Sequence, residues 1–370
     1  MRHQISFVGG QLLPVLLGIK EFSPDHVHFI VSKESKNKIT QIRSFIFEVG
    51  FSENICDPFD FFSVRAACEK ILNKLDQNDE IKINLTGGTK VMVLAAQSLI
   101  LERKLNGFYI NLDGTLLNLP SYNSQKLSCE LSINEFFEIS GHKLHRYKAL
   151  SDYFIDDFKA IDEIATFSVN YDKLILLINS KIRKNYDNLY KIPLYGKLEL
   201  DKSTKFIWKD KSIMVDFNGK EIFKISSPNV RSLFFHAAWW ELIVAREISK
   251  WSKAKELLLQ CKLPFKTDAK TIKNEIDILV NLGSKLIFVE CKSGLVKSED
   301  INKLKIVNEI YGGIISKSLL VCRFKPTPTI IEKCKELNID VFYCNLNRIE
   351  VNPLNKLITT LEELEKRLII

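Results

Sequence analysis

The chain has 370 residues, of which 46% are apolar and 26% are charged, a composition typical of a globular protein with room for two hydrophobic cores. It has no apolar run near the roughly 18–20 residues that cross a bilayer. Its start, MRHQISFVGG, is too short in its apolar part for a signal peptide. We therefore expect a cytoplasmic protein that no membrane segment anchors.

The distribution of charge indicates which part of the chain could bind a polyanion, and the cysteine spacing indicates whether zinc sites or disulfides are expected. Residues 1–150 hold 17 Lys and Arg against 16 Asp and Glu, whereas residues 151–370 hold 36 against 29. The basic excess therefore lies in the second part, which is the better candidate for contact with a polyanion. The eight cysteines form no C-x-x-C pair, so we expect buried free thiols rather than zinc ligands or disulfides.

Strands and helices alternate through the first 120 residues. Such alternation is typical of a mostly parallel, Rossmann-like sheet with helices on both faces. Residues 51–60 are expected to form only a connection. The predicted strands are 4–10, 26–32, 80–85 and 107–114, and the predicted helices are 11–22, 37–50, 62–75 and 91–104.

The rest of the chain predicts a second α/β part after a connecting region. Residues 121–160 indicate a connection with helical pieces, and the short β segments that follow include a hairpin turn at Asn218–Gly219. One long helix is expected over 229–251. The strands expected beyond it are 276–280, 286–292, 318–324 and 340–344, and the helices are 298–313, 328–338 and a terminal one. The expected division is 1–145, 146–225 and 226–370.

The stretch DILVNLGSKLIFVECKSG, residues 277–294, predicts a hairpin with acids at both of its open ends. Glu290 and Lys292 are two apart in a strand, so they point the same way. If 282–285 form the loop, Asp277 falls opposite Glu290, and like charges so placed repel. A divalent cation such as Mg²⁺ would resolve this repulsion by accepting both carboxylates. Lys292 would then lie beside the ion, able to hold or help deprotonate a water; an ordinary surface ion pair is the alternative interpretation.

A third acid is predicted to join this hairpin. Glu241 lies in the apolar stripe that Ala237, Val244 and Ile248 form at helical spacing. A buried carboxylate needs a cation or a proton, so Glu241 could reach the same metal from the helix side. Glu275 could be a further metal ligand, although an exposed acid explains it as well. Lys303 and Lys305 could contact phosphates, although a solvated helix face explains them as well.

The spacing of these residues resembles the PD-(D/E)XK nucleases, which have the restriction-endonuclease-like fold. The resemblance rests on a helix Glu followed by Asp-x12-Glu-x-Lys on a hairpin, with Ile276 where the family usually has Pro. It implies that Asp277, Glu290 and Glu241 bind Mn²⁺ or Mg²⁺ and that Lys292 is the catalytic lysine. Such a site hydrolyses phosphodiesters.

The first part contains a glycine turn, NLTGGTK at 84–90, between a predicted strand and a predicted helix. Glycines let a backbone approach a ligand closely, and the amide groups at a helix start attract anions. The turn satisfies neither the Walker A pattern nor G-x-G-x-x-G.

In this context the turn resembles the signature of CARF domains, the CRISPR-associated Rossmann folds that sense cyclic oligoadenylates. The resemblance covers about residues 1–140 and includes a first strand that ends in VGG, followed by QLLP. Family ligands lie across the carboxyl ends of the strands. Ser32, Lys33 and Asp113 are weaker candidates. The implied ligand contacts are Gly9, Gly10, Gln11, Pro14, Thr86, Gly87, Gly88, Thr89 and Lys90.

The order of the two parts resembles the CRISPR ancillary nucleases activated by cyclic tetraadenylate. This implies a homodimer, because CARF domains pair about a two-fold axis that the symmetric activator shares. It also implies that Mn²⁺ or Mg²⁺ supports cleavage of single-stranded RNA or DNA, or nicking of duplex DNA, in antiviral defence.

Three other interpretations stay open. Arg231 and His236 fit the R-x4–6-H motif of the metal-free HEPN ribonucleases, although HEPN domains are all helical and strands are predicted after His236. A sensor that only binds nucleic acid is the second, although Asp277, Glu290 and Lys292 are all present. A CARF pocket that degrades its own activator is the third.

Overall fold

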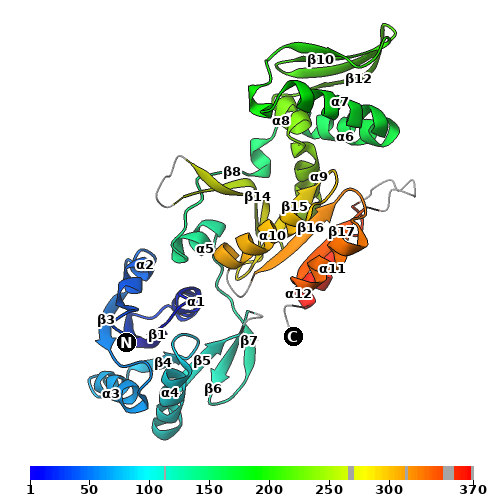
Figure 1. Cartoon of the computed structure of the whole chain (residues 1–370). Coiled ribbons are helices and arrows are strands. Elements are labelled where there is room, and N and C mark those ends of the chain that lie inside the picture. Colours follow the sequence, from blue (N-terminus) through cyan, green and yellow to red (C-terminus); the bar gives the residue numbers. More distant parts are fainter. Residues whose placement is uncertain (112–113, 266–270, 313–315, 345–353, 368–370) are drawn as a thin grey trace.

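The structure is a computed structural model that describes residues 1–111, 114–265, 271–312, 316–344 and 354–367 (Figure 1). The described residues form three β-sheets: residues 2–126 supply one, residues 196–226 another, and residues 256–343 the third, which a short strand at 146–148 extends. The α/β class expected from the sequence is confirmed in both the first and the last part. Among the described helices, none is long and apolar enough to span a membrane.

The first sheet has seven strands in the order β3-β2-β1-β4-β5-β6-β7. The first five strands in this order pair in parallel, and β6 and β7 complete one edge in antiparallel fashion. Helices cover both faces, as expected. The strands are β1 (Arg2–Val8), β2 (His26–Val31), β3 (Gly50–Ile55), β4 (Glu80–Asn84), β5 (Asn106–Ile110), β6 (Thr115–Leu119) and β7 (Ser124–Lys126), and the helices are α1 (Leu13–Phe22), α2 (Ile39–Arg43), α3 (Phe61–Leu72) and α4 (Lys90–Arg103).

Two predictions for this part were wrong. The helix expected over 37–50 contains only a 3₁₀ turn (Lys36–Lys38) and the five residues of α2. The connection expected over 51–60 begins with β3, an edge strand parallel to β2. No residue of β3 is fully buried, and Gly50, Glu53 and Ile55 are exposed, so its largely polar sequence carries little of the apolar signal by which a strand is predicted.

The last part forms a six-stranded sheet in the order β17-β16-β15-β14-β13-β8. The strand β13 was not predicted, although it pairs along its length with β14. The strands are β8 (Arg146–Lys148), β13 (Glu256–Pro264), β14 (Ile272–Asn281), β15 (Leu286–Lys292), β16 (Lys317–Cys322) and β17 (Ile339–Tyr343), and the helices are α8 (Val230–Phe235), α9 (Ala238–Ile248), α10 (Ser298–Val307), α11 (Pro328–Glu336) and α12 (Leu357–Lys366).

Between these parts the chain forms a small outer unit of two helices and an antiparallel sheet. The helices are α6 (Ile155–Asn170) and α7 (Asp172–Asn185), and the strands are β9 (Gly196–Glu199), β10 (Thr204–Lys209), β11 (Ser212–Phe217) and β12 (Lys220–Ser226). The predicted turn at Asn218–Gly219 is present, with both residues at positive φ.

The six-stranded sheet lies between the other two sheets (Figure 1). Along β15, Ile287 and Val289 pack into a core shared with α9, α12 and the outer unit. Phe288, on the opposite face, packs into a core that also contains residues of α1, α2 and the connecting helix α5 (Ile133–Ile139). Alternate residues of β15 therefore pack toward the first domain on one face of the sheet and toward the outer unit on the other.

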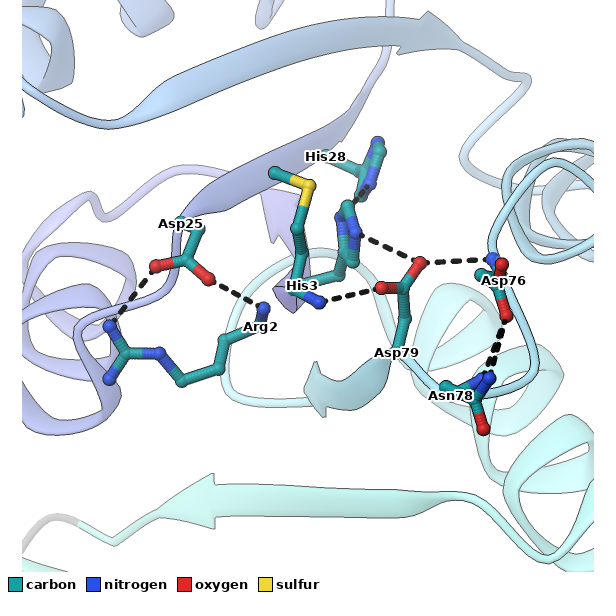
Figure 2. Close-up of polar contacts among 8 residues, drawn as sticks. Arg2, His3, Asp25, His28, Asp76, Asn78 and Asp79 are labelled. Atoms are coloured by element: carbon teal, nitrogen blue, oxygen red, sulfur yellow. Dashed lines mark hydrogen bonds and ion pairs between the residues drawn. The ribbon is translucent and has the colours of Figure 1, made fainter.

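A histidine network lies at the amino-terminal edge of the first sheet (Figure 2). His3 Nδ1 is 3.1 Å from His28 Nε2, and His3 Nε2 is 3.4 Å from Asp79 Oδ2. His28 Nδ1 in turn lies 2.8 Å from Ser52 Oγ. Burial, and then the neighbouring His26 and His3, lower the pKa of His28 to about 4.

This low pKa predicts that acid destabilises the first domain. The stability that neutral His28 contributes is full above its unfolded pKa near 6.5 and is lost as pH falls toward 4. We expect a loss of about 1–2 kcal/mol between about pH 7 and pH 5, measured by urea unfolding. His28→Gln should flatten this dependence, whereas the exposed His145→Gln should not. An unchanged slope in His28→Gln would contradict the assignment.

Candidate active site and ligand loops

The hairpin of β14 and β15 has the register expected from the sequence. Asn281 pairs with Leu286, and the ladder runs on to Ile278 opposite Val289. The turn is closed by a bond from the Leu282 amide to the Lys285 carbonyl, 2.9 Å long. The next pair in this register is Asp277 with Glu290.

The two acids are held in place by the hairpin itself. The Cys291 amide donates a 2.7 Å hydrogen bond to Asp277 Oδ2, which fixes this carboxylate against the partner strand. Glu290 is only 5% exposed. Burial raises the pKa of Asp277 well above its usual range, and repulsion from Glu290 and Glu241 raises it further. The three acids are therefore close enough to resist simultaneous ionisation.

Lys292 offsets part of this charge through ion pairs, the first of them the Glu290–Lys292 pair that the alternative interpretation also predicts. Its Nζ lies 2.8 Å from Glu290 Oε1 and 2.9 Å from Asp300 Oδ1. Burial alone would lower the pKa of the ammonium, but Glu290 and Asp300 outweigh it and raise that pKa. The Lys292 ammonium therefore forms two ion pairs at this site, one with Glu290 and one with Asp300.

Glu241 reaches the site from α9, but not from the single long helix that we predicted. That helix is broken into α8 and α9 at Ala237, which adopts a left-handed backbone with φ 59°. The break places Glu241 in the first turn of α9, where Gln260 Nε2 donates a 3.1 Å hydrogen bond to it. Burial raises the pKa of Glu241 to about 7. Helical periodicity predicts the apolar face correctly but carries no signal for the break.

Two polar residues of this site escaped the sequence analysis. Gln260 lies on the unpredicted strand β13, and its φ of 51° marks an irregular point in that strand. Asp300 lies in the first turn of α10, where an acid is common for local reasons. Asp300 also accepts a hydrogen bond from the Lys297 amide at the start of α10, which by itself explains an acid at this position. Its contact with Lys292 depends on the tertiary fold and so could not be predicted from the local sequence.

The donor set fits a hard divalent cation. Asp277 Oδ1, Glu290 and Glu241 offer carboxylate oxygens, and the raised pKa values of Asp277 and Glu241 show that local positive charge is in deficit. No three His, Cys, Asp or Glu side chains in the described part of the chain are already gathered at metal-binding distance. A cation would thus be held by two or more of these acids together with water.

The remaining polar candidates lie around this centre. Glu275 is 3.8 Å from Lys262 and close enough to raise the pKa of Glu241. Lys303 is exposed on α10, and Lys305 pairs with Glu309.

Arg231, one member of the HEPN-type pair that we considered, is bound to backbone carbonyls. Arg231 donates from both terminal nitrogens to the carbonyls of Ile192 and Pro193, each at 2.6 Å. His236 sits at the α8–α9 break, and the domain around it is built on a six-stranded sheet rather than on helices alone.

A cleft of about 1220 Å³ opens beside the acids and the lysine of this site. Glu241, Lys292 and Asp300 line one end of it. Its other wall is formed by α7 of the outer unit, so the cleft lies between two parts of the chain.

The glycine loops that follow β1 and β4 meet at the carboxyl edge of the first sheet. A Cβ on Gly9 would lie 2.8 Å from the Gly88 amide nitrogen, and one on Gly87 would lie 2.0 Å from the Phe7 carbonyl oxygen. Only glycine fits these two positions. Thr89 caps α4 by accepting from the Met92 amide, and its hydroxyl donates to the Pro58 carbonyl.

The predicted ligand contacts differ in exposure. Gly10, Gln11, Gly88 and Lys90 are exposed around these loops. Thr86 is held in the loop, because its hydroxyl accepts from the Ile110 amide at 2.8 Å.

Other candidates lie deeper or elsewhere. Pro14 is buried in the first turn of α1. Ser32 is buried too, Lys33 is exposed, and Asp113 lies outside the described residues. Lys38 was missed: its Nζ donates to the carbonyls of Gly9 and Gly10, at 3.1 and 3.0 Å.

The fold and the two sites define a protein that joins a Rossmann-like ligand-binding domain to a nuclease domain. Two family models match the chain: the Card1 CARF domain over residues 4–136 and the Card1-like endonuclease domain over residues 229–350. The chain therefore belongs to the Card1-like family, with a CARF domain first and an endonuclease domain second. None of the curated proteins matches it.

Solved structures share the fold over nearly the whole chain. Can2 from Sulfobacillus thermosulfidooxidans, in complex with cyclic tetra-adenylate, has a TM-score of 0.72 and 19% identity, with 99% of each chain covered. Protein VC1899 from Vibrio cholerae has a TM-score of 0.70 and 14% identity, covering 99% of this chain and 98% of that one. A type III CRISPR defence DNA nuclease activated by cyclic oligoadenylate has a TM-score of 0.59 and 15% identity, and 97% of this chain matches 51% of that one.

The crowded acids predict that neutralising one of them stabilises the metal-free protein. Because the folded-state pKa of Asp277 is raised, its contribution to stability is full below its unfolded pKa and is lost as pH rises. At about pH 8 in EDTA, Asp277→Asn should therefore unfold about 2–4 °C above the wild type, and the gap should close toward about pH 5. The exposed Glu332→Gln should show no such shift. A less stable Asp277→Asn at about pH 8 would contradict the buried repulsion.

Proposed function

We propose that the protein is a cyclic-tetraadenylate-activated, metal-dependent endonuclease that cleaves single-stranded RNA or DNA, or nicks duplex DNA, in type III CRISPR antiviral defence in the cytoplasm. The observation that carries this proposal is the convergence of Asp277, Glu290 and Lys292 on one hairpin of a domain that an endonuclease family model matches. The residue types are those that phosphodiester hydrolysis with a bound cation requires.

The chain's own residues divide the chemical work. Asp277 and Glu290 hold the cation, Mn²⁺ or Mg²⁺, with Glu241 as a third oxygen donor. When bound, such an ion polarises the phosphate and lowers the pKa of an attached water. Lys292 Nζ lies 2.8 Å from Glu290 Oε1, so it is placed to hold or help deprotonate an attacking water beside the ion and to stabilise charge on the phosphate. Asp300 fixes the lysine from the opposite side.

We assign residues 1–145 to the CARF sensor, 146–225 to the connecting region with the outer unit, and 226–370 to the nuclease. The glycine loops and the start of α4 support a site for the phosphates of a cyclic oligoadenylate, because backbone amides there can approach an anion closely. The Can2 structure, which contains cyclic tetra-adenylate and shares this fold, supports the choice of activator.

The sensor is proposed to form a homodimer through α4, and the helix has the apolar surface for it. Its buried face contacts the sheet, yet Leu94 and Leu101, seven residues apart, are 59% and 58% exposed. Residues at this spacing lie on one face of a helix. An exposed apolar stripe that begins beside the ligand loop suits a symmetric partner around a shared activator.

A continuous path links the ligand loop to the catalytic hairpin. Thr86 in the loop holds the Ile110 amide at the end of β5. The turn after β5 includes Gly114, and a Cβ there would lie 2.9 Å from Ser284 and Lys285 at the tip of the β14–β15 hairpin. Activator binding at Thr86 can thus bias the hairpin that carries Glu290, provided the ligand prefers one arrangement.

The cleavage assay tests the proposed function directly. Labelled single-stranded RNA and DNA are incubated with the protein, with and without cyclic tetraadenylate, in Mn²⁺ or in EDTA. We expect activator-dependent cleavage that EDTA abolishes, and a loss of at least about 100-fold in Lys292→Ala and Asp277→Asn. The exposed Lys303→Ala serves as the control. Cleavage that persists in EDTA but vanishes in Arg231→Ala would instead support a HEPN-type site.

The path through Gly114 predicts a variant that uncouples activation from binding. Gly114→Ala crowds the hairpin tip, so the ratio of activity with activator to activity without it should fall about tenfold, while activator affinity by calorimetry stays within about twofold. Gly219→Ala is the matched control, because both glycines have φ 78° and a Cβ on Gly219 meets nothing within 4 Å. Equal activation ratios in the two variants would remove this path from the mechanism.

A further inference from the structure

The wall of the cleft opposite the catalytic residues belongs to one face of α7. Most residues of α7 that line the cleft recur at helical spacing, namely Asp172, Ile175, Leu176, Asn179, Ser180 and Arg183, and Ile182 lines it as well. Neither family match includes α7, since the matches end at residue 136 and resume at residue 229. The outer unit therefore contributes a continuous surface to the active-site cleft that the two family domains do not supply.

Arg323 lies where this wall meets the nuclease sheet. Its amide donates to the Lys292 carbonyl at 2.8 Å, so it is the direct neighbour of the catalytic lysine across β15 and β16. The side chain is only 7% exposed, yet it lines the cleft. Its Nη2 donates to the Ser168 carbonyl of α6 at 2.7 Å, which ties the guanidinium to the outer unit.

The charge of Arg323 is not balanced by a bonded acid. Among the described residues no carboxylate lies within 4.0 Å of its guanidinium, and Asp172 acts on it only from farther away. Burial lowers the pKa of Arg323, because desolvation disfavours the charged form. A buried arginine without an ion-pair partner, next to a phosphodiesterase centre, is suited to receive a phosphate.

Aromatic rings flank this guanidinium. Its carbon lies 4.6 Å from the ring centre of Phe324 and 5.7 Å from that of Trp239. Trp239 is only 7% exposed, but Phe324 is 39% exposed and lines the cleft, so a planar base has the Phe324 ring to stack on beside the bound phosphate.

The other charges of the cleft are arranged along its length. The acids Glu241 and Asp300 belong to the catalytic end, and Glu299 and Asp172 lie at its sides. Arg183 at the far end of the α7 face forms no ion pair among the described residues, and the same holds for Lys297. Free cations therefore occur at both ends of the cleft, with Arg323 between α7 and the catalytic lysine.

We propose that a single strand of nucleic acid crosses this cleft from the catalytic acids to α7, with one phosphate held by Arg323, a neighbouring base stacked on Phe324, and a more distant phosphate held by Arg183. The proposal rests on the nuclease function proposed above and adds the path and form of its substrate. Stacking on protein rings requires bases that are not already stacked within a duplex, so the cleft selects single strands. The phosphate and base chemistry is common to RNA and DNA.

Binding to the full-length Asp277→Asn protein in EDTA tests the path without cleavage. Fluorescence anisotropy with cyclic tetraadenylate present compares labelled single-stranded RNA, single-stranded DNA of the same sequence, and the corresponding duplex. We expect both single strands to bind more tightly than the duplex, and the tighter of the two identifies the substrate. Arg183→Met should raise the Kd about tenfold and lower the slope of log K against log salt by about 0.7, the value for one lost phosphate contact on a single strand.

Lys184→Met is the matched control, because Lys184 is the next residue of α7, is equally exposed and does not line the cleft. Its Kd and salt slope should match the parent protein. Arg323→Met should raise the Kd at least about tenfold, with partial recovery in Arg323→Lys. Since Arg323 is buried, the exposed Arg183 keeps the test valid if Arg323→Met fails to fold.

Two results would overturn the path: equal Kd values in Arg183→Met and Lys184→Met, or duplex binding as tight as that of single strands. Failure of the nuclease function itself has a different signature. In that case Lys292→Ala, in the wild-type background, would cleave as well as the wild type, whatever the binding measurements give.

Discussion

The repulsion between buried carboxylates at the open end of the β14–β15 hairpin is the constraint on which the rest of this structure depends. Asp277 and Glu290 converge because the register of an otherwise apolar hairpin places them directly opposite each other. Their burial disfavours two negative charges at once, and Glu241 adds a third. Lys292 offsets part of this charge, and the proposed hard cation would offset the remainder. A fold that stores this imbalance is suited to bind metal and polarise phosphate.

The same hairpin extends from the CARF domain to the acids and the lysine of the endonuclease domain. Its tip contacts the turn after β5 of the CARF sheet, and its open end carries Asp277, Glu290 and Lys292. Its two faces lie in two different cores, one shared with α1, α2 and α5 and one shared with the outer unit. A small displacement of one element is therefore felt in both neighbouring parts, since packed interiors transmit strain.

The sequence predicts what depends on local pattern and leaves out what depends on tertiary placement. The hairpin register follows from alternation and a four-residue turn, and the glycine loops follow from Gly87 and its neighbours. The edge strand β3 and the strand β13 were missed because propensity is weak for strands whose pairing decides their form. The break at Ala237 was missed because the apolar stripe continues across it. Asp300 and Arg323 become functional candidates only when the fold brings them beside Lys292.

The outer unit has both of its chain connections on the nuclease sheet. The chain leaves through β8, which pairs with β13, and returns through α8 and α9, which packs on the same sheet. An excursion whose two ends are anchored side by side can be lengthened, shortened or exchanged while the flanking domains keep their own folds. Changes in the outer unit can therefore alter the cleft wall that α7 forms, while the CARF domain and the endonuclease domain keep their own folds.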